Sequence, residues 1–143
     1  MATLYLLCGL PGAGKTTLAK RLEQEHSALR FTPDDWITAL GIDAFDEDTR
    51  ATVETIQWNL AERALSIGTN VVIDFGVWSR QERDAFRSRA EALGAEVELR
   101  FLDVPRHELW ARLVRRGGGL PSEEVFDSWC NDLFERPTPD EFR

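Results

Sequence analysis

Short apolar runs alternate along this chain with segments in which apolar residues recur at helical spacing. The runs occur at Leu4–Leu7, at 28–32, at Val71–Ile73 and at Val97–Leu102, and each has the length of a buried strand. Between the runs, apolar residues recur three and four positions apart, which predicts amphipathic helices. Strands that alternate with helices imply a parallel sheet with right-handed crossovers, so we expect one α/β layered domain.

Capping residues and glycines mark the ends of the predicted helices. The longest helix is expected to begin at Asp46 and to end at Gly68. Its apolar residues at helical spacing are Val53, Ile56, Leu60, Ala64 and Ile67. Ser79 and Glu82 form a capping box for a later helix. From Phe134 onward we expect an irregular tail.

The stretch that follows the first apolar run has the spacing of a phosphate-binding loop. Residues 9–16 satisfy G-x-x-x-x-G-K-[ST], the P-loop or Walker A pattern, between a predicted strand and a predicted helix. Its glycines let backbone N–H groups curl toward a polyphosphate at the positive end of that helix. We expect Lys15 to contact the β- and γ-phosphates and Thr16 to bind Mg²⁺. The expected nucleotide-binding residues are Gly9, Pro11, Gly12, Ala13, Gly14, Lys15, Thr16 and Thr17.

Carboxylates follow two of the other predicted strands. Asp34 and Asp35 come after the run that Pro33 ends, and Asp74 ends the run Val71–Ile73. Because ligands of open parallel sheets bind outside the carboxyl ends of the strands, these carboxylates should lie near the phosphate loop. One of the paired aspartates then suits the proton acceptor of a reaction, and Asp74 suits the metal site. The alternative interpretation is structural: the paired aspartates would only cap a helix, and Asp74 would only cap a turn.

Arginines precede a run of three glycines near the carboxyl end of the chain. Arg112 and Arg116 are expected in the last turns of a helix that ends at Gly117–Gly119, where cations also favour the helix dipole. The glycines suit a small lid, near residues 112–121, that closes over a bound nucleotide and brings an arginine to the phosphates. For the acceptor side of the site we consider Asp35, Trp36, Arg50, Trp78 and Arg80.

The composition restricts the classes of partner and compartment. The chain has 143 residues and a net charge of −8, which suits one domain, residues 1–143, and disfavours a polynucleotide partner. Its two cysteines, Cys8 and Cys130, have the spacing of neither a zinc site nor a disulfide framework. The first apolar run breaks at Gly9 and is not preceded by basic residues, so we expect neither a signal peptide nor a membrane span. A cytoplasmic location is expected.

These motifs together resemble the small P-loop kinases, which include polynucleotide 5′-kinases, chloramphenicol phosphotransferase and zeta-type toxins. The segment from Asp74 to Arg80, D-F-G-x-W-S-R, looks most like unassigned P-loop proteins called AAA family ATPases. The resemblance implies a three-layer, nucleoside-kinase-like P-loop NTPase fold with strand order 2-3-1-4. It also implies that Asp34 is the base and that Arg112 and Arg116 are lid arginines. One position departs from the polynucleotide kinases, because their phosphate-binding arginine is Ile37 here.

The expected function is therefore transfer of the γ-phosphate of Mg-ATP to a hydroxyl of a small molecule. Lysine, metal and arginine would stabilise the charge on the transferring phosphoryl group, and Asp34 would accept the proton. Two alternatives stay open: a kinase for the 5′-hydroxyl of a polynucleotide, and a nucleotide-binding switch or ATPase without an acceptor. The sequence names neither the acceptor nor the oligomeric state.

Overall fold

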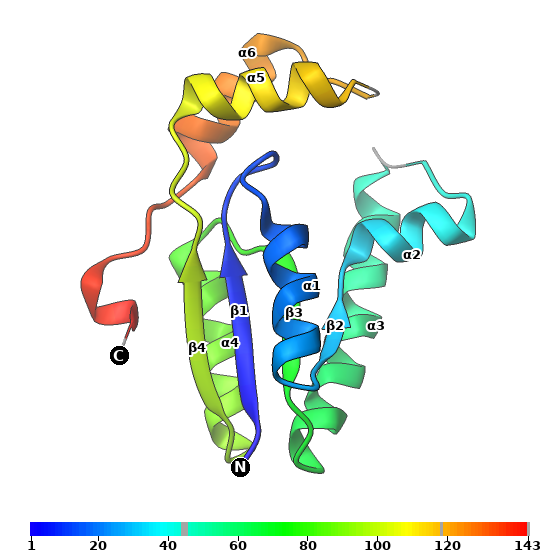
Figure 1. Cartoon of the computed structure of the whole chain (residues 1–143), viewed down its shortest axis with the longest axis vertical. Helices are drawn as coiled ribbons and strands as arrows, with labels where there is room; N and C mark the ends of the chain where they lie inside the picture. The colour runs from blue at the N-terminus through cyan, green and yellow to red at the C-terminus, as the bar shows by residue number, and fades with distance from the viewer. Residues whose placement is uncertain (44–45, 118, 143) are drawn as a thin grey trace.

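A computed structural model describes residues 1–43, 46–117 and 119–142. It contains a parallel four-stranded sheet with the order β2-β3-β1-β4, which confirms the predicted strand order (Figure 1). The strands are β1 (Thr3–Cys8), β2 (Leu29–Phe31), β3 (Val71–Gly76) and β4 (Glu96–Phe101). Because all strands are parallel, their carboxyl ends meet at one edge of the sheet.

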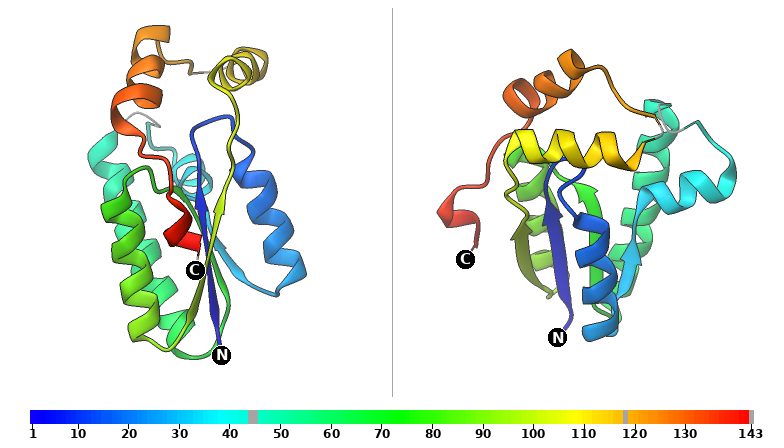
Figure 2. Two further views of the ribbon diagram at one scale, coloured as in Figure 1. Left: turned by 90° about the vertical axis from the view of Figure 1, so that its left-hand side faces the viewer. Right: turned by 45° about the horizontal axis from the view of Figure 1, so that its top comes forward.

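Helices cover both faces of the sheet, so the domain has the predicted three layers. α1 (Lys15–Glu25) lies on one face, while α3 (Glu47–Ser66) and α4 (Arg80–Ala92) lie on the other, as the edge-on view of Figure 2 shows. Each face has its own apolar cluster, centred on Leu7 and Leu22 on the α1 side and on Leu6 and Ile73 on the other. A short helix, α2 (Pro33–Leu40), follows β2 and leads toward α3.

A further group of helices, which we call the helix layer, crosses the carboxyl end of the sheet. It consists of α5 (Arg106–Arg116), α6 (Glu123–Ser128) and a π-helical turn, η1 (Trp129–Leu133) (Figure 1). A separate apolar cluster joins this layer to the phosphate loop through Leu10, Leu109 and Phe126. These elements surround the predicted lid region, of which Gly118 lies outside the described residues.

The buried face of α3 differs from the predicted one. Val53 and Ala64 are buried as expected, but Ile56, Leu60 and Ile67 are exposed by 46%, 48% and 63%. The residues that face the sheet instead are Val53, Gln57, Ala61, Ala64 and Leu65. The polar Gln57 and two alanines interrupt the apolar stripe that faces the sheet, so apolarity alone indicated the wrong side of this helix.

The prediction of an irregular tail is also only partly right. A short 3₁₀ helix, η2 (Pro139–Phe142), ends the described chain, and its Glu141 is 2% exposed. This segment packs beside β4 and α4, so the chain end belongs to the folded domain (Figure 2). None of the helices in the described ranges combines the length and the apolarity that crossing a membrane requires.

Candidate active site

The phosphate loop connects β1 to α1 and adopts the strained backbone that its glycines permit. Gly12 and Gly14 have φ angles of 88° and 95°, values that disfavour any residue with a Cβ. A Cβ on Gly12 would also lie 3.2 Å from the carbonyl oxygen of Leu109, so α5 packs directly against this loop. The Lys15 ammonium donates a hydrogen bond to the Leu10 carbonyl at 3.3 Å, and burial lowers its pKa. A half-buried cation at the start of α1 is therefore positioned over the loop.

Two hydroxyls converge on the carboxylate at the end of β3. The Thr16 hydroxyl donates to Asp74 Oδ2 at 2.9 Å, and the Thr32 hydroxyl donates to the same oxygen at 3.0 Å. Asp74 is only 5% exposed, and this burial raises its pKa, although the two hydrogen bonds and the Lys15 charge oppose the rise. The two residues proposed from the sequence to serve one metal ion are thus in direct contact.

The paired aspartates at the start of α2 each bind an arginine. Asp34 accepts a hydrogen bond from Arg50 of α3 at 2.7 Å, and Asp35 accepts one from Arg30 of β2 at 2.7 Å. The charge of Asp34 acts on the pKa of both Lys15 and Asp74, so these groups share one edge of the sheet. Asp34 and Asp35 are exposed, and α2 presents both in its first turn. An exposed carboxylate beside the phosphate loop is placed to meet an incoming hydroxyl.

The two predicted lid arginines have different environments. Arg112 donates to the carbonyl of Gly12 at 3.1 Å and pairs with Glu108 at 2.8 Å, so its guanidinium already touches the phosphate loop. Arg116 lies in the last turn of α5, is exposed, and forms no ion pair within the described part of the chain. Arg112 is therefore the arginine that the structure brings to the loop.

Not all residues considered for the acceptor side meet there. The Trp78 indole donates from Nε1 to the Gly9 carbonyl at 3.3 Å and packs near Trp129, so it lies beneath the phosphate loop. Trp36 is partly buried and packs edge-on against Phe31 at the margin of the core. Arg80 pairs with Asp140 at 2.6 Å and is occupied by the chain end.

Several polar residues near this edge were not singled out in the sequence. Thr32 holds Asp74 and also accepts a hydrogen bond from Arg30 at 2.8 Å. On α3, burial raises the pKa of Glu54, and the charges of Arg50 and Asp34 act on it. Gln57, one turn further along, is fully buried, and neither of its side-chain polar atoms has a hydrogen-bond partner among the described residues. Only the position of Thr32, at the carboxyl end of a strand beside the aspartates, offered a signal for any of these.

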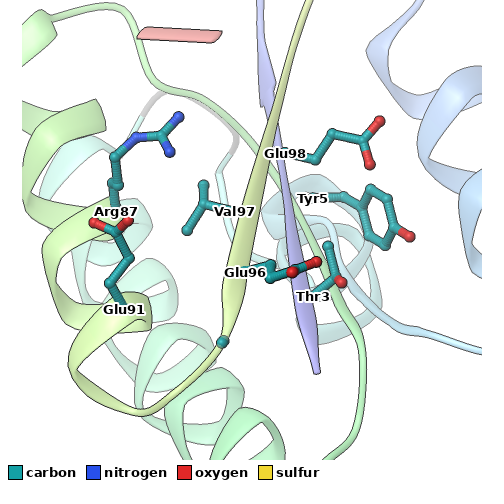
Figure 3. Close-up of a pocket in the computed structure, with 8 residues that line it drawn as sticks. Thr3, Tyr5, Arg87, Glu91, Glu96, Val97 and Glu98 are labelled. Atoms are coloured by element: carbon teal, nitrogen blue, oxygen red, sulfur yellow. The ribbon is translucent and has the colours of Figure 1, made fainter. Parts of the chain in front are cut away.

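One hollow in the surface lies away from the predicted site, and another lies beside the phosphate loop. The first, of about 570 Å³, surrounds the amino-terminal half of the edge strand β4, with Arg87 and Glu91 on one side and Tyr5 and Glu98 on the other (Figure 3). Its lining holds three glutamates, at 91, 96 and 98, against the one arginine, a charge balance that does not suit phosphate. The second hollow, of about 210 Å³, includes Leu10 of the phosphate loop, Leu102 after β4 and Leu109 of α5 in its lining.

The residues at this edge fit a magnesium ion that arrives with a nucleotide. Thr16 and Asp74 present oxygen atoms, the ligands that Mg²⁺ prefers. Within residues 1–43, 46–117 and 119–142, no group of three or more His, Cys, Asp or Glu side chains could hold a metal by itself. A small number of protein oxygens is what Mg²⁺ requires when substrate phosphates and water complete its coordination.

Comparison with known proteins agrees with this fold. A gluconokinase from Sinorhizobium meliloti 1021 superimposes with a TM-score of 0.64 at 17% identity, over 97% of this chain and 77% of that one. The APS kinase CysC of Mycobacterium tuberculosis, solved with AMPPNP and APS, gives 0.67 at 17% identity, over 95% and 83%. A chain of the Pnkp1/Rnl/Hen1 RNA repair complex gives 0.74 at 23% identity, and this chain covers 92% of its own length but only 44% of that chain.

These neighbours have the fold of the small P-loop kinases, which confirms the resemblance predicted from the sequence. A family model described as an AAA domain matches residues 4–134, which include the phosphate loop, Asp34, Asp74 and the helices above them. Because the match covers most of the chain, the protein belongs to this AAA domain family and has a nucleotide-binding P-loop fold.

Proposed function

We propose that this protein transfers the γ-phosphate of Mg-ATP to a hydroxyl group of a small molecule. One observation carries the proposal: Lys15, the Thr16–Asp74 contact and an exposed Asp34 lie at one edge of the sheet. A nucleotide-binding switch is complete with the first two features, because it has no acceptor hydroxyl to deprotonate. A phosphotransferase needs all three.

The chain supplies positive charge to the transferring phosphoryl group from two directions. The N–H groups of the phosphate loop and the Lys15 ammonium bind the phosphate oxygens from below. Arg112, which touches the loop at Gly12, offers a guanidinium from the helix layer above. Thr16, together with a water near Asp74, would hold Mg²⁺, which would supply further positive charge to the phosphates. Fixed cations at a loose transition state are the main source of catalysis in this reaction class.

Asp34 accepts the proton of the acceptor. The hydroxyl oxygen forms a bond to the γ-phosphorus, the bond from that phosphorus to the bridging oxygen of ADP breaks, and the proton passes to the Asp34 carboxylate late in the step. The ion pair with Arg50, 2.7 Å long, orients the carboxylate and leaves its second oxygen for the hydroxyl. Asp35 is less suited, because Arg30, whose side chain is 16% exposed, draws it toward β2.

The charges on the acceptor side favour a small acceptor over a polynucleotide. Arg50 and Arg30 are both paired with carboxylates, and Ile37 is 2% exposed, where the polynucleotide kinases have their phosphate-binding arginine. A protein that binds a single strand must neutralise several phosphates with free cations. Each neutralised phosphate adds about 0.7 to the slope of log affinity against log salt concentration. The gluconokinase and the APS kinase among the structural neighbours act on small molecules by their names, whereas Pnkp1 belongs to an RNA repair complex.

The test is a screen of hydroxyl-bearing compounds with [γ-³²P]ATP, in which label transferred to the compound is measured. Neutral sugars, polyols and nucleosides are compared with an oligonucleotide that carries a 5′-hydroxyl. The Lys15→Ala variant serves as the control for contaminating kinases. Lys15-dependent labelling of a small molecule supports the proposal, whereas efficient labelling of the oligonucleotide with a steep salt dependence would replace it with the polynucleotide kinase. Steady ATP hydrolysis with no labelled product would favour the switch.

A further inference from the structure

An ion pair between α4 and η2 is almost completely buried. Arg83 of α4 and Glu141 of η2 are each 2% exposed, and Arg83 Nε donates to Glu141 Oε1 at 2.7 Å. The backbone N–H of Thr138 donates to the second carboxylate oxygen at 2.8 Å, and Arg87 donates to the Glu141 carbonyl. Two charges removed from water are costly unless every group is hydrogen-bonded, and here both are. A pair this well satisfied holds one defined geometry.

The Nη1 group of Arg83 is directed at the turn that follows β3. Nη1 donates to the Val77 carbonyl at 2.9 Å and to the Trp78 carbonyl at 3.1 Å. Val77 has a φ of 37°, in the left-handed region that a β-branched residue avoids, and Gly76 before it has a φ of 93°. A backbone in this conformation persists only where its surroundings hold it. On the side of the turn that faces α4, the two hydrogen bonds from Arg83 hold this backbone conformation.

The same turn is hydrogen-bonded to Gly9, the first residue of the phosphate loop. The N–H of Gly9 donates to the Gly76 carbonyl at 3.2 Å, and the Trp78 indole donates to the Gly9 carbonyl at 3.3 Å. A Cβ on Gly76 would lie 3.2 Å from Trp78 Nε1, so turn and indole are closely fitted. A continuous chain of hydrogen bonds therefore runs from Glu141 through Arg83 and the turn 76–78 to Gly9.

The chain end also runs beside the helix layer above the site. The N–H of Glu135 donates to the Trp78 carbonyl at 2.8 Å, directly after η1. Arg136 binds both oxygens of Asp103, at 2.9 and 2.6 Å, which ties the exit of the helix layer to its entry after β4. Figure 2 shows the chain descending from this layer to the side of the sheet, where Arg83 and Arg87 of α4 bind Glu141 of η2. The tail thus reaches the turn 76–78 from two points.

We propose that Arg83 and Glu141 are positioning residues for nucleotide binding, and that the docked tail, residues 134–142, sets the conformation of the phosphate loop through the turn 76–78. This inference rests on the proposed function only in that the loop binds nucleotide. The tail acts as a strap: with Glu141 in place, Arg83 holds the turn and Gly9 is fixed for phosphate. Without it, the turn relaxes and the first N–H groups of the loop lose their alignment.

The main experiment compares Glu141→Gln with Glu25→Gln in the full chain. Glu141→Gln keeps the shape but removes the buried charge, whereas Glu25 lies at the end of α1 away from the tail, and the side chains of its pair with Arg21 are 54% and 64% exposed. Affinity for Mg-AMPPNP is measured by calorimetry. We expect Glu141→Gln to weaken binding by about tenfold or more, while Glu25→Gln stays within about twofold of the natural sequence.

Cys8 provides an independent readout of the turn. It is fully buried at the end of β1, its thiol donates to the Val77 carbonyl at 3.5 Å, and burial raises its pKa to about 11. Alkylation by iodoacetamide, mapped by mass spectrometry to separate Cys8 from Cys130, should be slow in the natural protein. It should accelerate by about tenfold or more in Glu141→Gln at a temperature well below unfolding, because the turn that covers the thiol opens.

A double variant separates positioning from general stability. Replacing both partners, Arg83→Met with Glu141→Leu, restores an apolar fit and is expected to recover the melting temperature. It does not restore the hydrogen bonds to Val77 and Trp78, so nucleotide affinity should stay low and Cys8 reactive. Recovery of affinity together with melting temperature would show that the pair serves stability alone and would overturn the proposal. Unchanged affinity and Cys8 protection in Glu141→Gln would overturn it as well.

The outcomes also separate this inference from the proposed function. If the natural protein binds no Mg-AMPPNP, the proposed function fails, and the Cys8 reactivity of the variants still tests the link between tail and turn. If the natural protein binds nucleotide and Lys15→Ala does not, but Glu141→Gln binds normally, the strap alone is refuted.

Discussion

Replacing the buried carboxylate Asp74 by asparagine should weaken metal-dependent binding while leaving the fold intact. Asp74 accepts hydrogen bonds from Thr16 and Thr32 on one oxygen. Hydrogen bonds to a charged acceptor contribute about 1.5–3 kcal/mol and those to a neutral one about 0.5–1.5 kcal/mol, so two weakened bonds cost about 2–3 kcal/mol.

An opposing effect comes from the burial of the charge. Burial raises the pKa of Asp74, so its ionised form at neutral pH lowers the free energy of unfolding, and a neutral amide removes this cost. Burial of an ion costs several kcal/mol, so the two effects nearly cancel, and we expect the free energy of unfolding to change by less than about 2 kcal/mol. For a domain of this size, that limits the change in Tm to about 6 °C.

The effect on the metal should be much larger than the effect on stability. Loss of a carboxylate that orients a metal-bound water costs about 10- to 100-fold in metal affinity. The assay is binding of AMPPNP over a range of Mg²⁺ concentrations, with Tm recorded for the same samples. We expect the Mg²⁺ concentration for half-maximal binding to rise by about 10- to 100-fold in Asp74→Asn.

Asp34→Asn is the matched control, because it removes a carboxylate from the same edge. Asp34 is exposed and its ion pair with Arg50 contributes about 0–1 kcal/mol at most, so this variant should keep both its Tm and its Mg²⁺ requirement. Phosphoryl transfer should instead fall by about 10²-fold or more, once an acceptor is known. An unchanged Mg²⁺ requirement in Asp74→Asn would refute the metal assignment, and exchanged phenotypes would mean that the two carboxylates have each other's role.

Three further outcomes are expected. Lys15→Ala should lower transfer or hydrolysis by about 10²-fold or more in a turnover assay, because it removes the cation nearest the phosphates; normal turnover with a verified fold would contradict the phosphate-loop assignment. Burial raises the pKa of Glu141, but the hydrogen bonds from Arg83 and Thr138 outweigh burial and hold the pKa below its usual value of 4.5. The contribution of Glu141 to stability is therefore complete above pH 4.5 and is lost as the pH falls through the lowered pKa. Thermal unfolding should therefore show a Tm difference between the natural protein and Glu141→Gln that is constant near neutral pH and shrinks below pH 4.5, and a constant difference down to pH 2 would contradict the ion pair. Excess single-stranded RNA should not compete with Mg-AMPPNP at moderate salt, which a fluorescent-nucleotide displacement assay checks.

The nucleotide half of the site could be predicted from the sequence because its determinants are local. The glycines of residues 9–16, Lys15 and Thr16 lie within one turn and the start of one helix, so spacing alone positions them. The strand that precedes the loop and the carboxylates that end two other strands are equally local signals. A parallel sheet then brings strand ends together by geometry, which is why Asp34 and Asp74 were expected beside the loop.

The tertiary structure decided the contacts between distant segments. Arg83 and Arg87 of α4 are buried with Ala90, and Glu141, the partner of Arg83, is 58 residues away in the chain. No periodicity indicates which acid will neutralise a buried arginine. The same holds for Arg50, which neutralises Asp34, and for Arg80, which binds Asp140 rather than an acceptor.

The face of α3 shows the physical limit most clearly. Apolar periodicity favoured Ile56 and Leu60, yet the helix buries Gln57 and Ala61 instead, and the small side chain of Ala61 lets the helix approach the sheet closely. Burial there depends on the space between layers, which is known only once the layers have met. Local sequence thus determined the phosphate loop and the order of elements. Packing between layers determined which polar groups face the site and which are buried in the domain.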